Sequence, residues 1–348
     1  MTARASALGF RPTVAPALCD DVTTWLPAHG APPLFIQAKQ GIFPTVDASM
    51  AWMEKKQTLL DTLLADFGAI VFRDFAFETT EDFDRYSSLY ERYAGGYVAG
   101  ASPRSTVVGN VMEATRLAPD FFIWLHQEMA YLRDYPSRIA FFGRKVPPKG
   151  GATIIGDMRE FTRRMPENFR LQIEKHGVRG VRNYAPLGGG AKVARHVDDK
   201  SWDDGFETAD PQEVEEICAA KGIQPIWNKD GSLTIVTITD GFAIHPVTGE
   251  RIYRSNLHTN ARTYEHFGRN NPAWDEARQQ QAFHTGYTLG NGEEVASEKA
   301  REVGEIVDSL ITRWQWRNGD IMLVDNLQVA HGRDPFEGDR QTLVALFA

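Results

Sequence analysis

Three residues of types that bind transition metals stand out in this chain: His126 and Glu128, separated by one residue, and the distant His331. Two imidazoles and one carboxylate can occupy one face of an octahedral ferrous ion and leave the opposite face open for a co-substrate and oxygen. Arg340 follows nine residues after His331, and its planar guanidinium suits a carboxylate of such a co-substrate. The pattern predicts a mononuclear iron site in an oxygenase.

The short His-x-acid motif is weak evidence on its own. With nine histidines and 46 acidic residues among 348, about one match is expected by chance, and the chain has a second at His196 and Asp198. His126 follows the apolar run Phe121–Leu125, which is typical of a strand. On a strand, residues two apart point to the same face, so His126 and Glu128 would project together. His196 lies in a Gly-rich, basic stretch and is interpreted as a loop histidine, with a role in a substrate lid as the alternative.

The region around His331 predicts a strand followed by a tight return of the chain. Ile321–Val324 is apolar and reads as a buried strand, and Val329 and His331 then alternate toward one face. Turn-forming residues follow, namely Gly332, Pro335, Gly338 and Asp339. We expect a hairpin from His331 to Arg340, which would bring the guanidinium back beside the metal.

The elements that must position these residues are helices first and then mainly strands. Apolar residues at helical spacing predict helices, in chain order, at 51–67, 79–93, 158–175, 211–220 and 297–314. Gly68 should end the first helix, and Thr79 to Asp82 has the composition of a helix start. The Gly-rich stretch 177–210 has no clear period and is expected to be a long loop.

The order of elements predicts a mainly β protein with flanking helices. A parallel α/β fold would alternate strands and helices regularly, which this chain does not do. The expected core is a double-stranded β-helix, a jelly roll of the cupin type. We expect an N-terminal irregular and helical region at 1–67 that packs on the core, and a core domain at 68–348 with an insertion or lid at about 177–300.

The composition of the chain limits which classes of binding partner and which cellular compartment are expected. The net charge is −8 and there is no long basic run, so neither nucleic acid nor an anionic membrane is an expected partner. The two cysteines, Cys19 and Cys218, are expected to be free thiols. No secretion signal is visible, and no apolar stretch approaches the roughly 18 residues of a membrane span. A cytoplasmic enzyme with a small-molecule substrate is expected, and its oligomeric state is left open.

Three blocks of sequence give the chain a recognisable likeness. They are Leu125–Tyr131 continuing through Pro136 and Phe141-Phe142, Pro147–Thr153, and Gly319–Asp325 with Asn326, His331–Arg333, Pro335-Phe336 and Arg340. In order and spacing, over roughly residues 68–348, the chain resembles the taurine dioxygenase/clavaminate synthase-like family of Fe(II)/2-oxoglutarate-dependent dioxygenases. The resemblance is far more specific than a single His-x-Glu.

The resemblance implies roles for the matched positions. His126, Glu128 and His331 would bind Fe(II), Thr153 would hydrogen-bond a carboxylate of 2-oxoglutarate, and Arg340 would pair with its distal carboxylate. It also implies O2 as a co-substrate, with succinate and CO2 as co-products of the oxidation of an aliphatic carbon. Related halogenases replace the carboxylate ligand with a small residue, so the presence of Glu128 favours hydroxylation.

The substrate is less well indicated than the cofactors. The chain is also similar to the aspartyl hydroxylases of nonribosomal peptide synthesis, at 101–104, 206–227 and 245–250. This likeness implies an amino-acid-derived substrate, free or tethered to a carrier protein, in natural-product (antibiotic) biosynthesis. Taurine-type enzymes carry a second arginine four residues beyond the first, where this chain has Val344, so a sulfonate is not expected. Arg104 and Asn256 are the candidate substrate-binding residues.

Two alternatives remain open at this point. The same cofactors could support desaturation, epoxidation or cyclisation instead of hydroxylation, because these outcomes depend on the substrate. A non-catalytic jelly-roll binding protein is the remote alternative, and it would not need a complete set of metal ligands. The other histidines, among them His245, His258 and His284, are expected to be structural or surface groups.

Overall fold

The structure is a computed structural model that describes residues 12–27, 30–100, 106–115, 117–189, 192–194, 197–198, 200–259 and 285–348. Its largest feature is an eight-stranded sheet in the order β1-β2-β3-β18-β7-β21-β5-β4. The strands are β1 (Val22–Trp25), β2 (Leu34–Ala38), β3 (Ala69–Arg73), β4 (Thr106–Val108), β5 (Val111–Glu113), β7 (Arg138–Lys145), β18 (Ile321–Asp325) and β21 (Gln341–Phe347). Two strands of the N-terminal region therefore join the core sheet, since β2 pairs with β3 in parallel.

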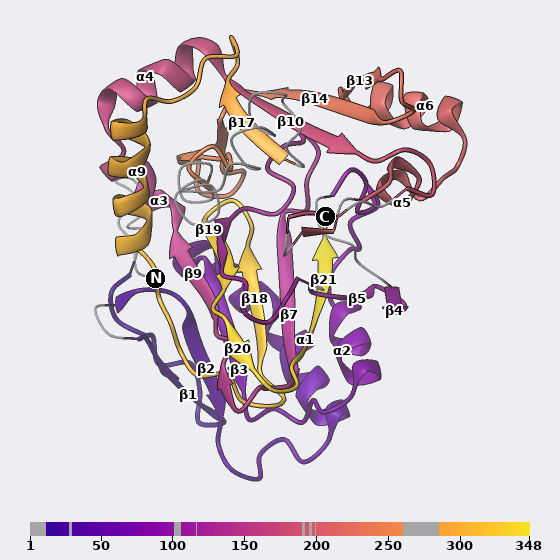
Figure 1. Cartoon of the computed structure of the whole chain (residues 1–348). Coiled ribbons are helices and arrows are strands. Elements are labelled where there is room, and N and C mark those ends of the chain that lie inside the picture. The colour runs from indigo at the N-terminus through magenta and orange to yellow at the C-terminus, as the bar shows by residue number, and fades with distance from the viewer. Residues whose placement is uncertain are drawn as a thin grey trace.

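A smaller sheet faces the large one and closes the barrel. It has the order β6-β19-β9, with β6 at Ile123–His126, β9 at Thr153–Asp157 and β19 at Val329–Arg333. Apolar side chains of both sheets, such as Val71 and Val324 from the large one and Ile155 from the small one, share one buried cluster. The expected mainly β, jelly-roll architecture is thereby confirmed (Figure 1).

Two helices cover the outer face of the large sheet. α1 (Val46–Phe67) begins at Thr45, whose side chain accepts from Ala48 N, and ends at Gly68 in a left-handed conformation, as predicted. α2 (Thr80–Ser87) begins with a capping box between Thr79 and Asp82 and ends before the expected residue 93. Along β3, Val71 faces the barrel interior whereas Ile70 and Phe72 join the cluster against α1. This alternation is what a sheet buried on both faces requires.

Further helices differ from their predicted bounds. The helix expected at 158–175 is two helices, α3 (Met158–Arg164) and α4 (Glu167–His176). Pro166 separates them, because proline disfavours helical backbone at the residue before it, and Met165 is extended with ψ 131. α9 (Ser297–Ser309) ends before the expected residue 314, since Thr312 exchanges two backbone hydrogen bonds with Ile155 of β9.

The insertion builds a separate sheet that lies above the barrel in Figure 1. Its order is β13-β14-β10-β17, with β10 at Val178–Tyr184, β13 at Gln224–Trp227, β14 at Leu233–Thr239 and β17 at Thr285–Leu289. The expectation of a loop from 177 was wrong, because β10 is a seven-residue strand whose alternate residues are buried. The other elements are α5 (Trp202–Phe206), α6 (Pro211–Lys221) and the paired strands β11 (Lys192–Ala194) with β12 (Val197–Asp198) and β15 (Phe242–Ile244) with β16 (Arg251–Tyr253).

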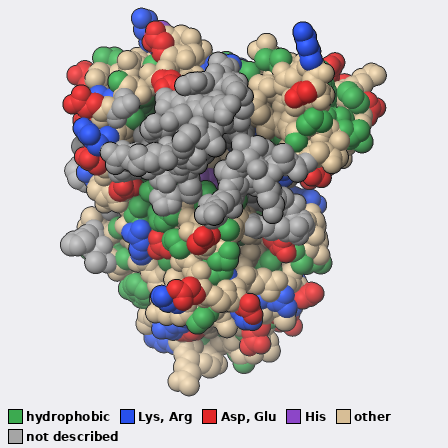
Figure 2. Space-filling model, in the orientation of Figure 1, with side chains coloured by type: hydrophobic (Ala, Val, Ile, Leu, Met, Phe, Trp, Pro, Cys, Tyr) green, Lys and Arg blue, Asp and Glu red, His purple; other side chains and the backbone are tan. Residues whose placement is uncertain are grey.

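The surface of the described residues carries charges of both signs. On the face seen in Figure 2, their Lys and Arg side chains are interspersed with Asp and Glu. Among the described helices, none combines the length and the apolarity that crossing a membrane requires.

Candidate metal centre

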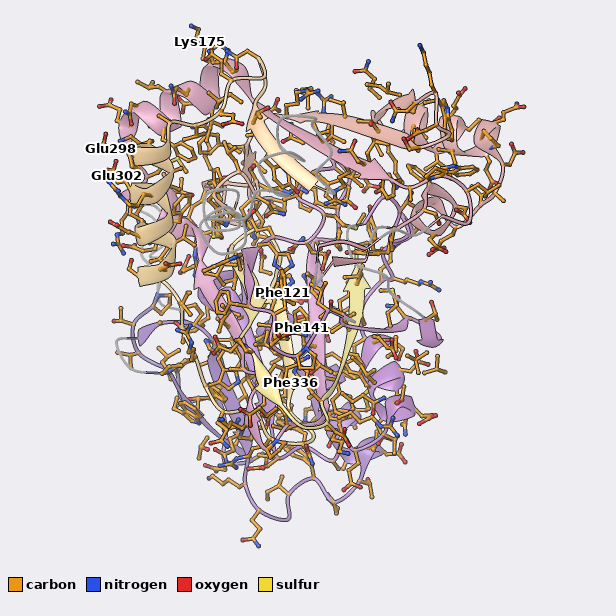
Figure 3. The ribbon with its side chains drawn as sticks, viewed as in Figure 1. Phe121, Phe141, Lys175, Glu298, Glu302 and Phe336 are labelled. Carbon is orange, nitrogen blue, oxygen red and sulfur yellow. The ribbon has the colours of Figure 1, made fainter. Side chains whose placement is uncertain are left out.

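His126 and His331 lie directly opposite each other on the paired strands β6 and β19. Their ring centroids are 4.4 Å apart. The ring of His331 also lies 4.9 Å from the ring of Phe141, which belongs to β7 in the large sheet, and Figure 3 shows Phe141 in the middle of the barrel. The two imidazoles therefore project from the small sheet into the barrel interior.

Glu128 reaches the same place from a turn. The expectation that it shares a strand with His126 was wrong, because β6 ends at His126 and residues 128–130 form a turn. The turn includes Met129, which has a positive φ of 54°. Even so, Oε2 of Glu128 lies 3.8 Å from Nε2 of His331. One ligand atom each from His126, Glu128 and His331 lie within 4.8 Å of one another, and all three residues are buried or half-buried.

The donor set of this cluster fits a divalent transition metal. Nδ1 of His126 lies 2.9 Å from the carbonyl of Trp124, and a neutral imidazole that donates to this carbonyl from Nδ1 leaves Nε2 available as a ligand. An outer hydrogen bond of this kind is usual for metal-binding histidines because it fixes the ring and its tautomer. The two-histidine, one-carboxylate set is the one that non-haem ferrous oxygenases use.

Thr153 is brought to the cluster by strand register. On the β9–β19 pair, Thr153 lies opposite Arg333 and Ile155 lies opposite His331. Opposite residues share a face, as do residues two apart on one strand, so Thr153 and His331 project from the same face of the small sheet. Thr153 is buried, at 3% exposure.

Arg340 reaches the Gly-Gly turn before β9 by a different route from the one expected. The predicted hairpin from His331 to Arg340 was wrong, because β19 and β21 belong to different sheets. The connection crosses from the small sheet to the large one, and its short strand β20 (Phe336–Glu337) pairs with β8 (Lys149–Gly150). Arg340 ends this connection, and its Nε donates to the carbonyl of Gly151 at 3.3 Å.

Two arginines make this end of the site strongly cationic. The guanidinium carbons of Arg333 and Arg340 lie 5.1 and 5.6 Å from the ring centroid of Phe336, which Figure 3 shows below Phe141. Burial, together with the charge of Arg333, lowers the pKa of Arg340 to about 9. Burial also lowers the pKa of Arg333 to about 10. Burial thus disfavours the charged forms of both arginines, and a bound anion would stabilise these forms.

The two substrate-binding predictions have different outcomes. Arg104 lies outside the described residues. Asn256 is buried, and its side-chain amide is hydrogen-bonded to the backbone of Gln127, between the candidate ligands His126 and Glu128. The structure thus places Asn256 beside the candidate metal ligands, whereas a contact between Asn256 and a substrate stays a prediction.

The remaining histidines of the insertion form structural contacts where they are described. Nε2 of His245 lies 2.8 Å from Oδ2 of Asp325, at the end of β18. His258 is fully buried, with Nε2 2.7 Å from the carbonyl of Leu125, and burial lowers its pKa to about 4. His196 and His284 lie outside the described residues.

Several residues at the site were missed in the sequence. Asn326, which is fully buried, hydrogen-bonds the backbone of Glu128. Arg254 hydrogen-bonds the carbonyls of Met129 and Leu132 in the turn after Glu128. Their partners are backbone groups more than a hundred residues away, so no local pattern could have revealed them.

The fold and the site together define a non-haem iron, 2-oxoglutarate-dependent oxygenase of the jelly-roll class. Residues 36–346 match the family described as "Taurine catabolism dioxygenase TauD, TfdA family". The chain belongs to this family, whose members are Fe(II)/2-oxoglutarate-dependent dioxygenases. The resemblance seen in the three sequence blocks is thereby confirmed.

Two curated proteins and one solved structure are similar over most of the chain. The dapdiamide synthesis protein DdaC of Enterobacter agglomerans is 26% identical over 294 residues, or 82% of this chain and 84% of that protein. A clavaminate synthase-like protein of Arabidopsis thaliana is 28% identical over 296 residues, or 82% and 83%. A candidate alpha-ketoglutarate-dependent taurine dioxygenase from Burkholderia xenovorans superposes with a TM-score of 0.50 at 14% identity, covering 94% of this chain and 92% of that one. This last likeness supports the fold alone.

Proposed function

We propose that this protein uses Fe(II), 2-oxoglutarate and O2 to hydroxylate an unactivated C–H bond of a small amino-acid-derived substrate. The observation that carries the proposal is the cluster of His126, Glu128 and His331, whose ligand atoms lie within 4.8 Å of one another. The cationic site at Arg340 on the neighbouring strand connection supports it. The reaction needs both sites, one for the metal and one for the anionic co-substrate.

Each part of the site has a separate task in this proposal. His126, Glu128 and His331 would hold the iron, which supplies the oxidising chemistry when it is bound. Arg340 would bind the distal carboxylate of 2-oxoglutarate with its planar fork of donors. The Thr153 hydroxyl would donate to a carboxylate of the same molecule. Glu128, His331 and Thr153 are buried and His126 and Arg340 are half-buried, so water has limited access and charge-assisted contacts are strengthened.

Natural-product biosynthesis is the setting that we propose for this reaction. It is supported by the similarity to a protein of dapdiamide synthesis. The cluster includes the carboxylate of Glu128, which favours hydroxylation over halogenation. The substrate is either free or tethered to a carrier protein, and the succinate screen below distinguishes these two forms.

Two measurements test the proposal. Anaerobic addition of Fe(II) and 2-oxoglutarate to the protein should produce a weak metal-to-ligand charge-transfer band in the visible spectrum, and His126→Ala should abolish it. Succinate release should then be screened across free amino acids and the same amino acids on a carrier protein. A well-folded protein that shows no band with Fe(II) and 2-oxoglutarate would exclude the iron site.

The mass of the product distinguishes hydroxylation from its alternatives. Gain of one oxygen atom supports hydroxylation or epoxidation, whereas loss of two hydrogens identifies desaturation or cyclisation. Either result leaves the proposed iron and 2-oxoglutarate sites intact, because the outcome depends on the position of the substrate above the metal.

A further inference from the structure

The turn that carries Glu128 is held by asparagine side chains from two distant segments. Asn326 accepts from Glu128 N at 2.8 Å and donates to Glu128 O at 3.0 Å. Asn256 makes the same pair of hydrogen bonds with Gln127, the residue before Glu128. It accepts from Gln127 N at 3.2 Å and donates to Gln127 O at 3.4 Å. Each asparagine therefore satisfies both backbone groups of one residue, and the two residues are consecutive.

The insertion makes further contacts with this turn, two residues before Asn256. Arg254 donates from one amino group to the carbonyl of Met129 at 3.0 Å and from the other to the carbonyl of Leu132 at 2.8 Å. Its guanidinium lies 3.3 Å from the ring centroid of Tyr135, which fixes the plane of the fork. The side chain of Gln127 completes the connection by donating to the carbonyl of Tyr253 at 3.2 Å.

The shape of the turn depends on such contacts for two reasons. Asn256, Arg254 and Glu128 are all buried, with exposures of 8%, 5% and 4%, so water cannot easily replace a lost hydrogen bond and an unpaired backbone group is costly. Met129 adopts a left-handed conformation at φ 54°, which a residue other than glycine keeps only when its surroundings impose it.

We propose that Asn256 and Arg254 are positioning residues through which the insertion sets the place of the metal-binding carboxylate of Glu128. The inference rests on the proposed function of the same site. It gives Asn256 a role that differs from the substrate contact expected from the sequence, and it gives Arg254 a role that the sequence did not suggest. Asn326, on the segment after β18, supports the turn from outside the insertion.

Metal affinity measures this role without a substrate and without turnover. We would titrate the full-length protein with Co(II) by calorimetry and record the visible absorption of the bound ion. Asn256→Ala and Arg254→Met should raise the Kd for Co(II) about tenfold or more, the usual effect of losing a group that orients a ligand. The absorption bands of bound Co(II) should shift as well. Arg254→Lys keeps the charge but not the fork, and should fall between Arg254→Met and the native protein.

Asn183→Ala is the matched control. Asn183 lies on β10 of the same insertion and accepts a hydrogen bond from Thr234 at 2.7 Å, so its loss should leave the Kd and the absorption bands unchanged. Asn256→Ser and Arg254→Lys provide milder changes that can be measured if the larger ones do not fold.

A double-mutant cycle decides whether Asn256 acts through Glu128. In a Glu128→Ala background the metal has only the imidazoles, and Asn256→Ala should then change the Kd less than about twofold, since coupled residues are non-additive. A native Kd in Asn256→Ala, or an equal loss with and without Glu128, would overturn the positioning role and leave the proposed function standing. Failure of the unmodified protein to bind Co(II) would overturn both.

Discussion

Nε of Arg340 donates a hydrogen bond to the carbonyl of Gly151 at 3.3 Å, which ties the cationic residue to the Gly-Gly turn before β9. A Cβ atom at Gly151 would lie 3.3 Å from Cδ of Arg340 and 2.6 Å from a ring carbon of Pro147. The backbone there has a φ of +71°, which glycine adopts readily and other residues do not. Both the backbone conformation at Gly151 and the lack of room for a Cβ atom require glycine there. The position of Arg340 depends on this turn, because its side chain packs against it and donates to its carbonyl.

Gly151→Ala should weaken 2-oxoglutarate binding by about tenfold while metal binding is retained. The alanine would displace Arg340 or Pro147, and the left-handed backbone adds about 1–2 kcal/mol of strain. Calorimetric titration with 2-oxoglutarate and with Co(II) would separate the two effects. Gly222→Ala is the matched control, since Gly222 also has a positive φ of 65° but no atom within 4 Å of the added Cβ. An unchanged Kd for 2-oxoglutarate in Gly151→Ala would contradict the role of this turn.

Arg340→Met should raise the Kd for 2-oxoglutarate by roughly 30-fold or more. Removing one partner of a buried, hydrogen-bonded charge pair costs about 2–5 kcal/mol, and burial already disfavours the uncompensated cation, as its lowered pKa shows. Arg340→Lys should recover only part of the affinity, because an ammonium group does not match a carboxylate as a fork does. Arg144→Met is a suitable control because Arg144 is exposed and contacts Gln341. Equal affinities of Arg340→Met and the native protein would place the dicarboxylate elsewhere.

Local patterns accounted for those parts of the fold that depend on neighbours in sequence. The end of α1 at Gly68 and the start of α2 within Thr79 to Asp82 were predicted because each depends on contacts within a few residues. β10 was missed because Gly180 and Arg182 interrupt its apolar alternation, although both face the interior. A buried arginine looks like a loop residue until its partner, the ring of Tyr131 at 3.6 Å, is known.

The candidate site divides in the same way. His126, Glu128 and His331 are of residue types that bind transition metals, so the cluster could be predicted from the sequence before its geometry was known. Turn chemistry between His331 and Arg340 predicted a change of direction, but it could not show that the next strand joins the opposite sheet. The residues that hold the turn of Glu128 were not predicted, because the sequence does not show which distant backbone groups an amide side chain binds. Asn326 is an example, since it accepts a hydrogen bond from the backbone of Glu128.

His258 should make the protein less stable as the pH falls below about 6.5. Its pKa is lowered from 6.5 to about 4 in the folded protein by burial, so between these values the unfolded chain takes up a proton that the folded protein does not. Stability from this group is complete above about pH 6.5 and declines by about 1.4 kcal/mol for each pH unit down to about 4. Lowering the pH from 7.5 to 5 should therefore cost about 2 kcal/mol.

Denaturant unfolding of the native protein and of His258→Gln, both in the presence of a chelator, would measure this contribution. The difference between the two profiles isolates His258 from the other titrating groups. Identical pH dependence of the two proteins would show that His258 takes up its proton at the same pH in the folded and the unfolded protein, which would contradict the lowering of its pKa by burial.

Removal of a bound metal should destabilise the protein by an amount that rises with the logarithm of the metal affinity. A ligand that binds only the folded state adds RT ln(1 + [L]/Kd), which is about 2.7 kcal/mol at a free concentration of 100 Kd. Native protein with Co(II) should therefore unfold at a higher denaturant concentration than the same protein with a chelator. His331→Ala should lose most of this increment, because His331 provides one of the three clustered ligand atoms. His176→Ala, at the end of α4, should keep the increment, and the same stabilisation in His331→Ala would show that Co(II) binds at another site.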